Sequence, residues 1–330
     1  MLYYQLDLYI IVLKYLGLYF MELILGSVFM MIVGMSWSLD GYIMGKIPKL
    51  GIDAAVLIFF ANVIAALACF GYIAVSVWRD GLPEFTSGSY LCLGMVLLSG
   101  MVNTFQLRML SAAMQRGPNG IVWTITQAGF IFPFLMGVIF FNEQLGWMRI
   151  AGMVLIITAL ILFGVSRGGQ GSGSWKLLAV LAFFITGVSQ SLCNLPSYFE
   201  AGSTLPSSWR TLAASCGFAI TAFGGSCLDK NFFSGIKFAV KVPKFWLYIG
   251  LCNIFSLFCS ITLLYPGMDK LERAGAGSIA FPMMVCSCLL SFELFSIAVL
   301  KEKRSPLEII ALIFCLLGVI GISGVPGMFF

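Results

Sequence analysis

The sequence predicts an all-α polytopic membrane protein with ten transmembrane helices, arranged as two inverted five-helix repeats. Of its 330 residues, 60% are hydrophobic and 10% are charged, whereas soluble domains carry about 25% charged residues. The apolar stretches are about 20 residues long, which at about 1.5 Å per residue matches about 30 Å of hydrocarbon. These stretches divide five and five around the glycine-rich segment 166–174.

The apolar stretches define the expected helices and the division of the chain. We expect spans at 23–45, 53–77, 89–114, 118–141, 147–165, 175–199, 207–228, 245–268, 275–300 and 306–325. The first five form one repeat over 21–166, a glycine-rich linker covers 167–174, and the second repeat covers 175–330.

Residues 1–20 fit neither repeat. They are rich in Tyr, Leu and Ile but contain Asp7 and Lys14. They lack the basic start and the small-residue cleavage site of a signal peptide. We interpret them as a poorly defined interfacial lead-in, or as sequence that precedes a true start near Met21. An eleventh crossing is the less favoured interpretation.

The odd number of spans in each half matters for topology. Five crossings put the start of the second half on the opposite side of the membrane, so homologous halves would be inverted copies. Residues of the fourth and fifth spans recur in the ninth and tenth, as the pairs Arg116 and Arg273, Gly120 and Gly277, and Glu143 and Glu302. Inverted repeats are typical of alternating-access carriers.

The two glutamates of this repeat have a structural interpretation. Glu143 and Glu302 each stand just before a helix start, where a carboxylate accepts free backbone N–H groups and favours the positive end of the helix. We therefore favour a capping role for both over a catalytic or proton-coupling one.

The placement of Lys and Arg predicts an orientation. We call the side where the first span ends side X and the side where it begins side N. Basic residues gather on side X, with four in the loop between the seventh and eighth spans. Since Lys and Arg of short loops stay in the cytoplasm, this pattern predicts a cytoplasmic side X and external termini.

The residue types exclude several chemistries. The chain has no histidine, so it cannot form a histidine triad, metal site or proton relay. Its ten cysteines lie almost entirely within spans and form no C-x-x-C pair, which favours packing over disulfides or metal ligation. Gly318, Gly321, Gly324 and Gly327 indicate a helix-packing face rather than a nucleotide loop. We expect no catalytic residues, no metal and no cofactor.

Several short motifs together resemble a known family. They are the small-residue entries GPNG at 117–120 and AGAG at 274–277, Pro133, Phe281-Pro282, and KEKRS at 301–305. In these motifs, and in the small-residue runs of the fifth and tenth spans, the chain resembles the ten-helix EamA-type branch of the drug/metabolite transporter (DMT) superfamily.

The resemblance implies a ten-helix carrier in which the first four helices of each half surround a central cavity. The fifth and tenth helices would pack at the periphery. Members of the family move amino acids, other metabolites, nucleotide sugars or drugs. The resemblance also implies cytoplasmic termini, opposite to the charge pattern, so the orientation is left open.

Three charged residues fall inside predicted spans on side X. Asp40, Arg108 and Glu293 each lie five to eight residues from a helix end, about 8 to 12 Å deep at about 1.5 Å per residue. Charges inside the membrane are rare and functional. One interpretation is a gate or coupling network in which Arg108 pairs with Asp40 or Glu293. The other is that Arg108 extends its charge to the interface and the residues are static.

Polar residues nearer the middle of the spans are the candidate substrate-binding residues. Helical spacing places several on common faces: Trp37, Asn103, Gln106, Trp123, Gln127, Gln190, Asn194, Asn253 and Ser256. Such groups need polar partners away from lipid, so they face other helices or a watery cavity. This uncharged, aromatic lining predicts a small neutral, zwitterionic or amphipathic solute rather than a polyanion.

We therefore predict a multi-pass protein of the inner or plasma membrane that acts as a secondary active transporter by alternating access. Its solute would be a small metabolite, an amino acid or an amphipathic drug-like molecule. The alternative is a membrane-embedded enzyme or a lipid-translocating protein. The expected partners are the solute and the lipid bilayer; a homodimer is compatible with the sequence, and no nucleic acid is expected.

Overall fold

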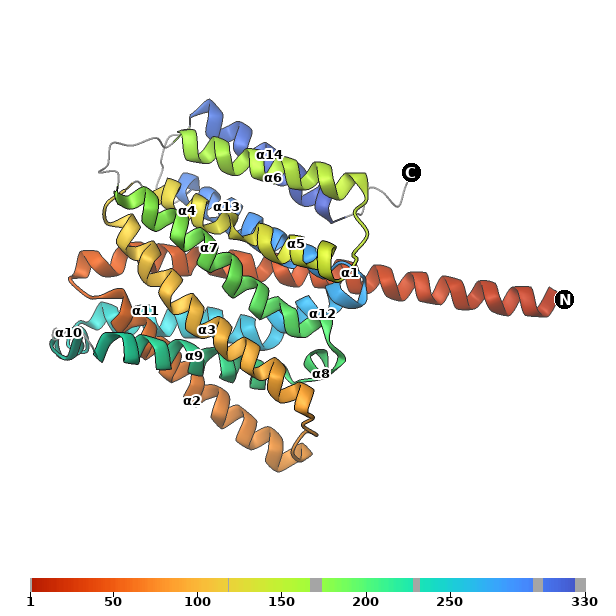
Figure 1. Ribbon diagram of the computed structural model, residues 1–330, viewed down its shortest axis with the longest axis horizontal. Coiled ribbons are helices and arrows are strands. Elements are labelled where there is room, and N and C mark those ends of the chain that lie inside the picture. The colour runs from red at the N-terminus through yellow and green to blue at the C-terminus, as the bar shows by residue number, and fades with distance from the viewer. Residues whose placement is uncertain (1, 118, 167–173, 228–231, 299–304, 324–330) are drawn as a thin grey trace.

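The computed structural model describes residues 2–117, 119–166, 174–227, 232–298 and 305–323, and shows a bundle of helices (Figure 1). Within these ranges some side chains, that of Glu293 among them, lie outside the description. The described part of the chain contains helices and connecting turns but no strand, in agreement with the predicted all-α class.

The first half of the chain forms the helices of five predicted spans. Their bounds are α1 Leu2–Lys46, η1 Ile47–Leu50, α2 Ala54–Asp80, α3 Ser87–Met114, α4 Asn119–Gln127, η2 Ala128–Phe130, α5 Ile131–Phe140 and α6 Trp147–Ser166. The fourth predicted span is composite, because the short η2 joins α4 to α5. Local capping defines the ends: Asp53 accepts a bond from the N–H of Ala55 at 2.7 Å at the start of α2.

The second half is also helical, with more interruptions. Its helices are α7 Ser174–Asn194, η3 Leu195–Tyr198, α8 Glu200–Ser203, α9 Ser207–Cys227, α10 Phe232–Ala239, α11 Pro243–Cys252, η4 Asn253–Leu257, η5 Ser260–Leu264, α12 Tyr265–Arg273, η6 Gly277–Ile279, α13 Ala280–Ala298 and α14 Pro306–Ile322. The segments η4 and η5 are π-helical turns within the eighth predicted span. Single π-helical turns are frequent at functional sites.

In the described part of the chain, five helical stretches are long and apolar enough to cross a membrane. They are Gly17–Leu50, Ala54–Asp80, Ser87–Met114, Trp175–Tyr198 and Pro243–Arg273, and shorter apolar helices accompany them. Within the described residues, each of the ten predicted spans is mostly helical. The protein is thus a multi-pass membrane protein.

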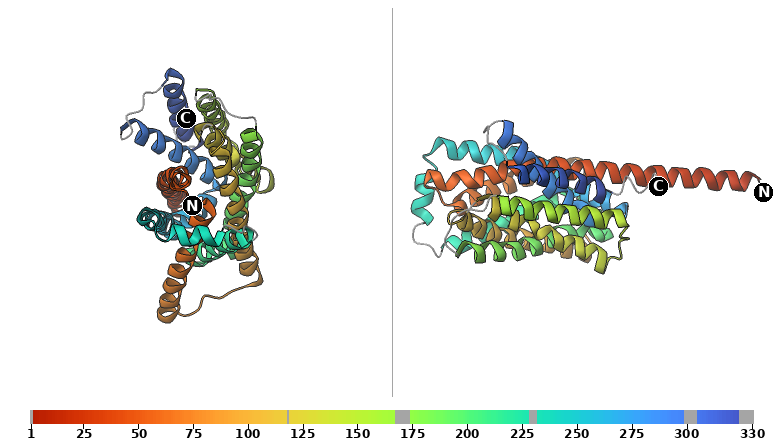
Figure 2. Two further views of the ribbon diagram at one scale, coloured as in Figure 1. Left: turned by 90° about the vertical axis from the view of Figure 1, so that its left-hand side faces the viewer. Right: turned by 90° about the horizontal axis from the view of Figure 1, so that it is seen from above.

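The segment expected as a lead-in is helical. Residues 2–20 continue α1 without a break, and this part of the helix projects beyond the bundle (Figures 1 and 2). The Leu, Ile and Tyr residues of this segment are compatible with helix, and no proline interrupts them. At about 1.5 Å per residue, α1 exceeds the thickness of the hydrocarbon region.

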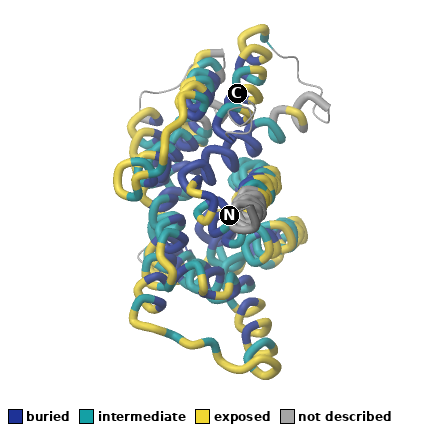
Figure 3. Tube along the Cα trace, turned by 90° about the vertical axis from the view of Figure 1, so that its right-hand side faces the viewer, coloured by how far each residue is buried: buried dark blue, intermediate teal, exposed yellow. Residues whose placement is uncertain are grey.

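Buried residues gather along the centre of the bundle, and exposed ones lie on its outer surface (Figure 3). The largest apolar cluster joins α1, α12 and α13 with α5, α6 and α14. α6 and α14 lie side by side along one edge (Figure 1), the peripheral placement that the family resemblance implies. Gly318 and Gly321 of α14 pack directly on Gly152 of α6, which confirms a helix-packing role for these two. Gly324 and Gly327 lie outside the described residues.

Glycine also allows α3 and α9 to approach closely. A Cβ at Gly217 of α9 would overlap the carbonyl oxygen of Leu97 and lie 3.0 Å from the nitrogen of Met101, both on α3. Reciprocally, a Cβ at Gly100 of α3 would overlap the carbonyl oxygen of Ala214. Backbone atoms cannot move aside cheaply, so both positions require glycine.

We expect Gly217→Ala to destabilise the protein by about 1–3 kcal/mol, because the added methyl group forces α3 and α9 apart. The apparent melting temperature of the purified protein in detergent checks this. The matched control is Gly224→Ala on the same helix, where a Cβ would meet nothing within 4 Å. Equal melting temperatures for the two variants would contradict the close packing.

Candidate functional site

A central cavity of about 250 Å³ lies between the two halves of the chain. It is lined by α1, α2, α3 and α4 of the first half and by α7, α9, α13 and the α11–α12 segment of the second. Of the predicted substrate-binding residues, those that line it are Trp37, Asn103, Gln106, Trp123, Gln127, Gln190, Asn253 and Ser256. The structure therefore brings together side chains from five separate predicted spans.

Asn194 is the predicted residue that does not line the cavity. Its side chain is buried at the end of α7, where Nδ2 donates to the carbonyl oxygen of Gly277 at 3.3 Å. This contact joins α7 to the start of η6, so Asn194 connects helices. The spacing of four residues from Gln190 placed both on one helical face but did not reveal how far the cavity extends along it.

Other polar residues of the lining were missed in the sequence: Asn62, Ser99, Thr186, Ser189, Thr211 and Ser215. Ser99 and Ser189 also join helices, because the Ser99 hydroxyl donates to the Ser189 carbonyl at 2.8 Å and the Ser189 hydroxyl donates to the Ser99 carbonyl at 3.1 Å. Small hydroxyl residues recur throughout apolar helices, so their presence alone gave no signal.

Asp40 lines the cavity and is held by the second half of the chain. The Ser256 hydroxyl donates to Asp40 Oδ2 at 2.5 Å, while Oδ1 has no hydrogen-bond partner. Ser256 belongs to the π-helical turn η4, where the widened helix alters the positions of neighbouring side chains.

Arg108 lies apart from Asp40. It lines a second hollow with Asp53, Ser111 and Gln115, near the side-X ends of α2 and α3. Among the described residues no ion pair joins Arg108 to Asp40. The side chain of Glu293, the other expected partner, lies outside the description. The gate expected from these three residues stays a prediction.

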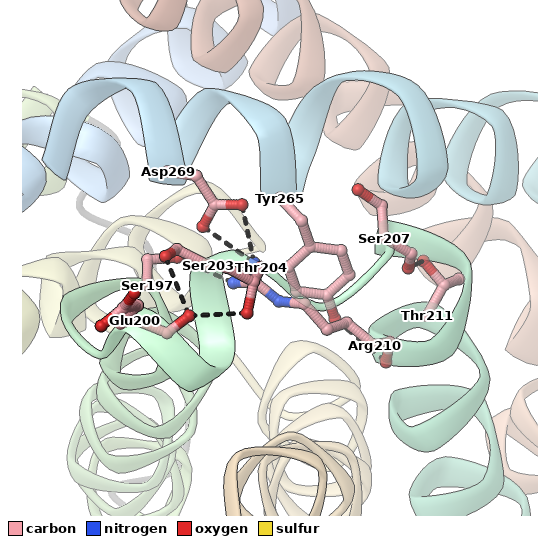
Figure 4. A network of polar contacts seen from close by, with 9 residues as sticks. All are labelled: Ser197, Glu200, Ser203, Thr204, Ser207, Arg210, Thr211, Tyr265 and Asp269. Atoms are coloured by element: carbon pink, nitrogen blue, oxygen red, sulfur yellow. Dashed lines mark hydrogen bonds and ion pairs between the residues drawn. The ribbon is translucent and has the colours of Figure 1, made fainter. Parts of the chain in front are cut away.

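The side-N end of the cavity rests on a buried ion pair (Figure 4). Arg210, on the first turn of α9, is fully buried, and its Nη1 donates to Asp269 Oδ1 at 2.8 Å and to Oδ2 at 2.9 Å. Nη2 donates to Ser197 Oγ at 2.7 Å. The guanidinium also lies over the ring of Tyr265, 4.3 Å from the ring centroid, a favourable cation–π arrangement. One cation thus joins α9, α12 and η3.

This cluster forms the floor of the cavity, because Tyr265 and Thr211, next to Arg210, both line it. The sequence did not reveal the pair. Arg210 and Asp269 lie within a few residues of predicted span ends. Charged residues at such positions are normally exposed to solvent, as loop residues are. A signal was present in the spacing of Tyr265 and Asp269, which are four apart on one helical face.

A second network joins the halves around Glu143. Its Oε1 accepts from the Tyr198 hydroxyl at 2.7 Å and from the backbone N–H of Ser278 at 2.9 Å, and its Oε2 accepts from the Ser278 hydroxyl. Glu143 therefore does cap a helix start, as expected, but that of η6 and α13 in the other half. Glu302 lies outside the described residues.

The local backbone positions Glu143. Asn142 has a φ of 52°, a left-handed conformation that asparagine tolerates better than most residues. Gly137 and Gly277 leave room for the network, because a Cβ at these positions would lie 2.6 Å and 2.9 Å from the Tyr198 hydroxyl oxygen.

A third contact joins α1 to α12 on side N. Glu22 accepts from Lys270 Nζ at 2.9 Å and from Arg273 Nη2 at 3.3 Å. Lys270 is partly buried, whereas Arg273 is exposed. These two residues therefore form ion pairs with Glu22. They also belong to the basic loop residues from which the orientation was predicted.

We expect Asp269→Ala to destabilise the protein by about 3–5 kcal/mol, because it leaves the Arg210 guanidinium buried without a counter-charge. Joint replacement as Arg210→Met with Asp269→Leu should recover most of this loss. Thermal unfolding in detergent measures both. The control is Asp80→Ala, which removes an exposed ion pair with Arg79 worth at most about 1 kcal/mol. Equal effects at the two aspartates would contradict the role of the buried pair.

Comparison with known proteins agrees with this architecture. A solved structure titled "Crystal structure of protein" superimposes with a TM-score of 0.62 over 93% of this chain and 96% of that chain. The sequence identity is 15%, so the likeness concerns the fold alone. No curated protein sequence matches the chain.

The family comparison concerns the first half. The model of the EamA-like transporter family matches residues 24–165, from within α1 to the end of α6. This family is one of transporters, in keeping with the expectation that the chain is not an enzyme. The resemblance predicted from the sequence is thereby confirmed: residues 24–165 match the EamA-like transporter family, a family of the DMT superfamily.

Proposed function

We propose that the protein is a secondary active transporter that moves a small organic solute by alternating access. A small metabolite, an amino acid or an amphipathic drug-like molecule would bind in the central cavity. The observation that carries the proposal is the asymmetry of this cavity. Its lining begins near the side-X ends of α1, α2 and α3, at Met44, Leu57 and Leu110, and ends at the floor formed by Tyr265 and Thr211.

The side-N networks favour a state that is closed toward side N. Glu143 joins the α5–α6 connection to Tyr198 and Ser278 of the second half, and Glu22 joins α1 to α12. Alternating access requires contacts of this kind, which can be exchanged for contacts on the other side. The partly buried Glu22 and Glu143 contacts are the ones we expect to break, while Arg210 and Asp269 stay paired.

Helix contacts support the proposed ten crossings in two inverted repeats. In that arrangement α1 corresponds to α7, α2 to α9, α3 to the α11–α12 segment, α4–α5 to α13, and α6 to α14. The contacts occur in related pairs. The contact between α1 and α13 corresponds to the contact between α7 and α4–α5. The contact between α3 and α7 corresponds to the contact between α12 and α1. The pairs α2–α9 and α6–α14 each join equivalent helices. This pattern is expected of a pseudo-twofold axis between the halves.

We expect Gln127→Leu to lower saturable uptake at least about tenfold, because Gln127 is a buried polar residue of the cavity wall and a lost polar contact to solute costs about 1–3 kcal/mol. Uptake of a radiolabelled solute panel into proteoliposomes, with and without a pH gradient, measures this. Gln144→Leu makes the same change at an exposed position and should leave uptake unchanged. If the proteoliposomes take up no solute of the panel, the proposal that the protein is a transporter is wrong.

The side-N closure predicts one-sided access to Cys193, a residue of the cavity wall. In a variant that keeps Cys193 as its only cysteine, a membrane-impermeant maleimide should modify this thiol from side X and leave it unmodified from side N. Oriented vesicles and mass measurement test each side. Equal modification from both sides would show that the floor at Tyr265 does not close the cavity.

A further inference from the structure

The charge inside the cavity differs from the sequence expectation of an uncharged lining. Among the described residues that line it, Asp40 is the one with a formal charge. Neither Arg210 nor Arg108 lines the cavity: Arg210 is paired with Asp269, and Arg108 lines the separate hollow near Asp53. The cavity therefore presents a carboxyl group with no counter-charge among these residues.

The carboxyl group of Asp40 is also incompletely bonded. Ser256 donates to Oδ2, the weakly donating thiol of Cys252 is a further neighbour, and the buried Oδ1 has no strong hydrogen-bond donor. A carboxylate without a counter-charge in apolar surroundings is costly, so such a group is stabilised by a proton or by a cation. A solute that supplies a positive charge and N–H donors would stabilise this carboxyl group.

Two aromatic rings share the cavity with this carboxyl group. Trp37 lies one helical turn before Asp40 on α1 and lines the cavity. Trp123 also lines it, and its ring packs against Gly41, the residue after Asp40, where a Cβ would lie 3.0 Å from the ring. Indole faces attract cations strongly when the site excludes water.

Further acceptors lie in the cavity wall. The side-chain oxygens of Gln127 and Gln190, two residues of the lining, are buried and have no donor. The described wall thus combines one carboxyl group, two indoles and unused amide oxygens, and offers no basic side chain to an anion. These features together select for a solute that donates hydrogen bonds and carries positive charge.

We infer that the cavity binds an amphipathic organic amine as its cation, with the ammonium group at Asp40 and the apolar part between Trp37 and Trp123. This inference rests on the proposed transport function and narrows its substrate class. A free carboxylate on the solute would find no cation in the described wall. Amines without a carboxylate should therefore bind better than the matching amino acids.

The test is calorimetric titration of the purified full-length protein in detergent with four related probes: phenethylamine, 2-phenylethanol, phenylalanine and 3-phenylpropionate. We expect phenethylamine to bind at least about tenfold more tightly than the other three, since a charge-assisted hydrogen bond in a dry site contributes about 1.5–3 kcal/mol. Equal affinities for phenethylamine and 2-phenylethanol would overturn the inference.

Amino-acid substitutions test whether Asp40 is responsible for the preference for phenethylamine over 2-phenylethanol. Asp40→Asn keeps the shape of the side chain and should reduce the preference for phenethylamine over 2-phenylethanol to about twofold or less. Asp40→Glu should retain it, and Ser256→Ala should retain it because the carboxylate remains. Asp80→Asn, at an exposed ion pair far along α2, is the control that should change nothing. A preference that survives in Asp40→Asn would also overturn the inference.

Uptake measurements separate this inference from the transport proposal. If proteoliposomes take up other solutes while phenethylamine shows no preferential binding, the amine site is wrong and the transporter stands. If no solute is taken up but phenethylamine binds through Asp40, the amine site stands and the transporter is wrong.

Discussion

The buried pairing of Arg210 with Asp269 is the constraint on which the side-N half of the structure depends. A guanidinium without solvent access requires a counter-charge and further acceptors, and these come from α12 and η3. Satisfying Arg210 therefore fixes α9, α12 and η3 relative to one another. It also sets the ring of Tyr265 beneath the guanidinium, and this ring closes the floor of the cavity.

The remaining polar groups divide into two kinds by their partners. On side N, Glu143 and Glu22 bond to groups of the other half, so they hold the halves together. In the cavity, Asp40 is only partly bonded, and the amide oxygens of Gln127 and Gln190 have no donor. The side-N carboxylates are bonded across the two halves, whereas the Asp40 carboxyl group in the cavity has no cation among the residues that line it. This division is what a carrier in one of its two end states needs.

Sequence patterns predicted the helices and several polar residues of the cavity wall, because span lengths and helical spacing are local properties. Trp123 and Gln127 are four apart and do share the wall. Sequence patterns did not predict the bonding partner of a polar side chain when that partner is distant in the chain. Glu143 caps a helix 135 residues away, Arg210 is neutralised by Asp269 across the α9–α12 interface, and Asp40 meets Ser256 rather than Arg108. Depth along a helix was readable from the sequence, but the choice of partner was not.

The central claim is that side N is closed here and opens during transport. Pulsed electron–electron resonance tests it most directly, with spin labels at Gln144 and Thr204, exposed positions on side N in opposite halves. The account predicts a single short distance without solute, and a second, longer population when a transported solute is added or when Glu143→Gln weakens the network. An unchanged single distance under both conditions, in protein that takes up the solute in vesicles, would contradict it.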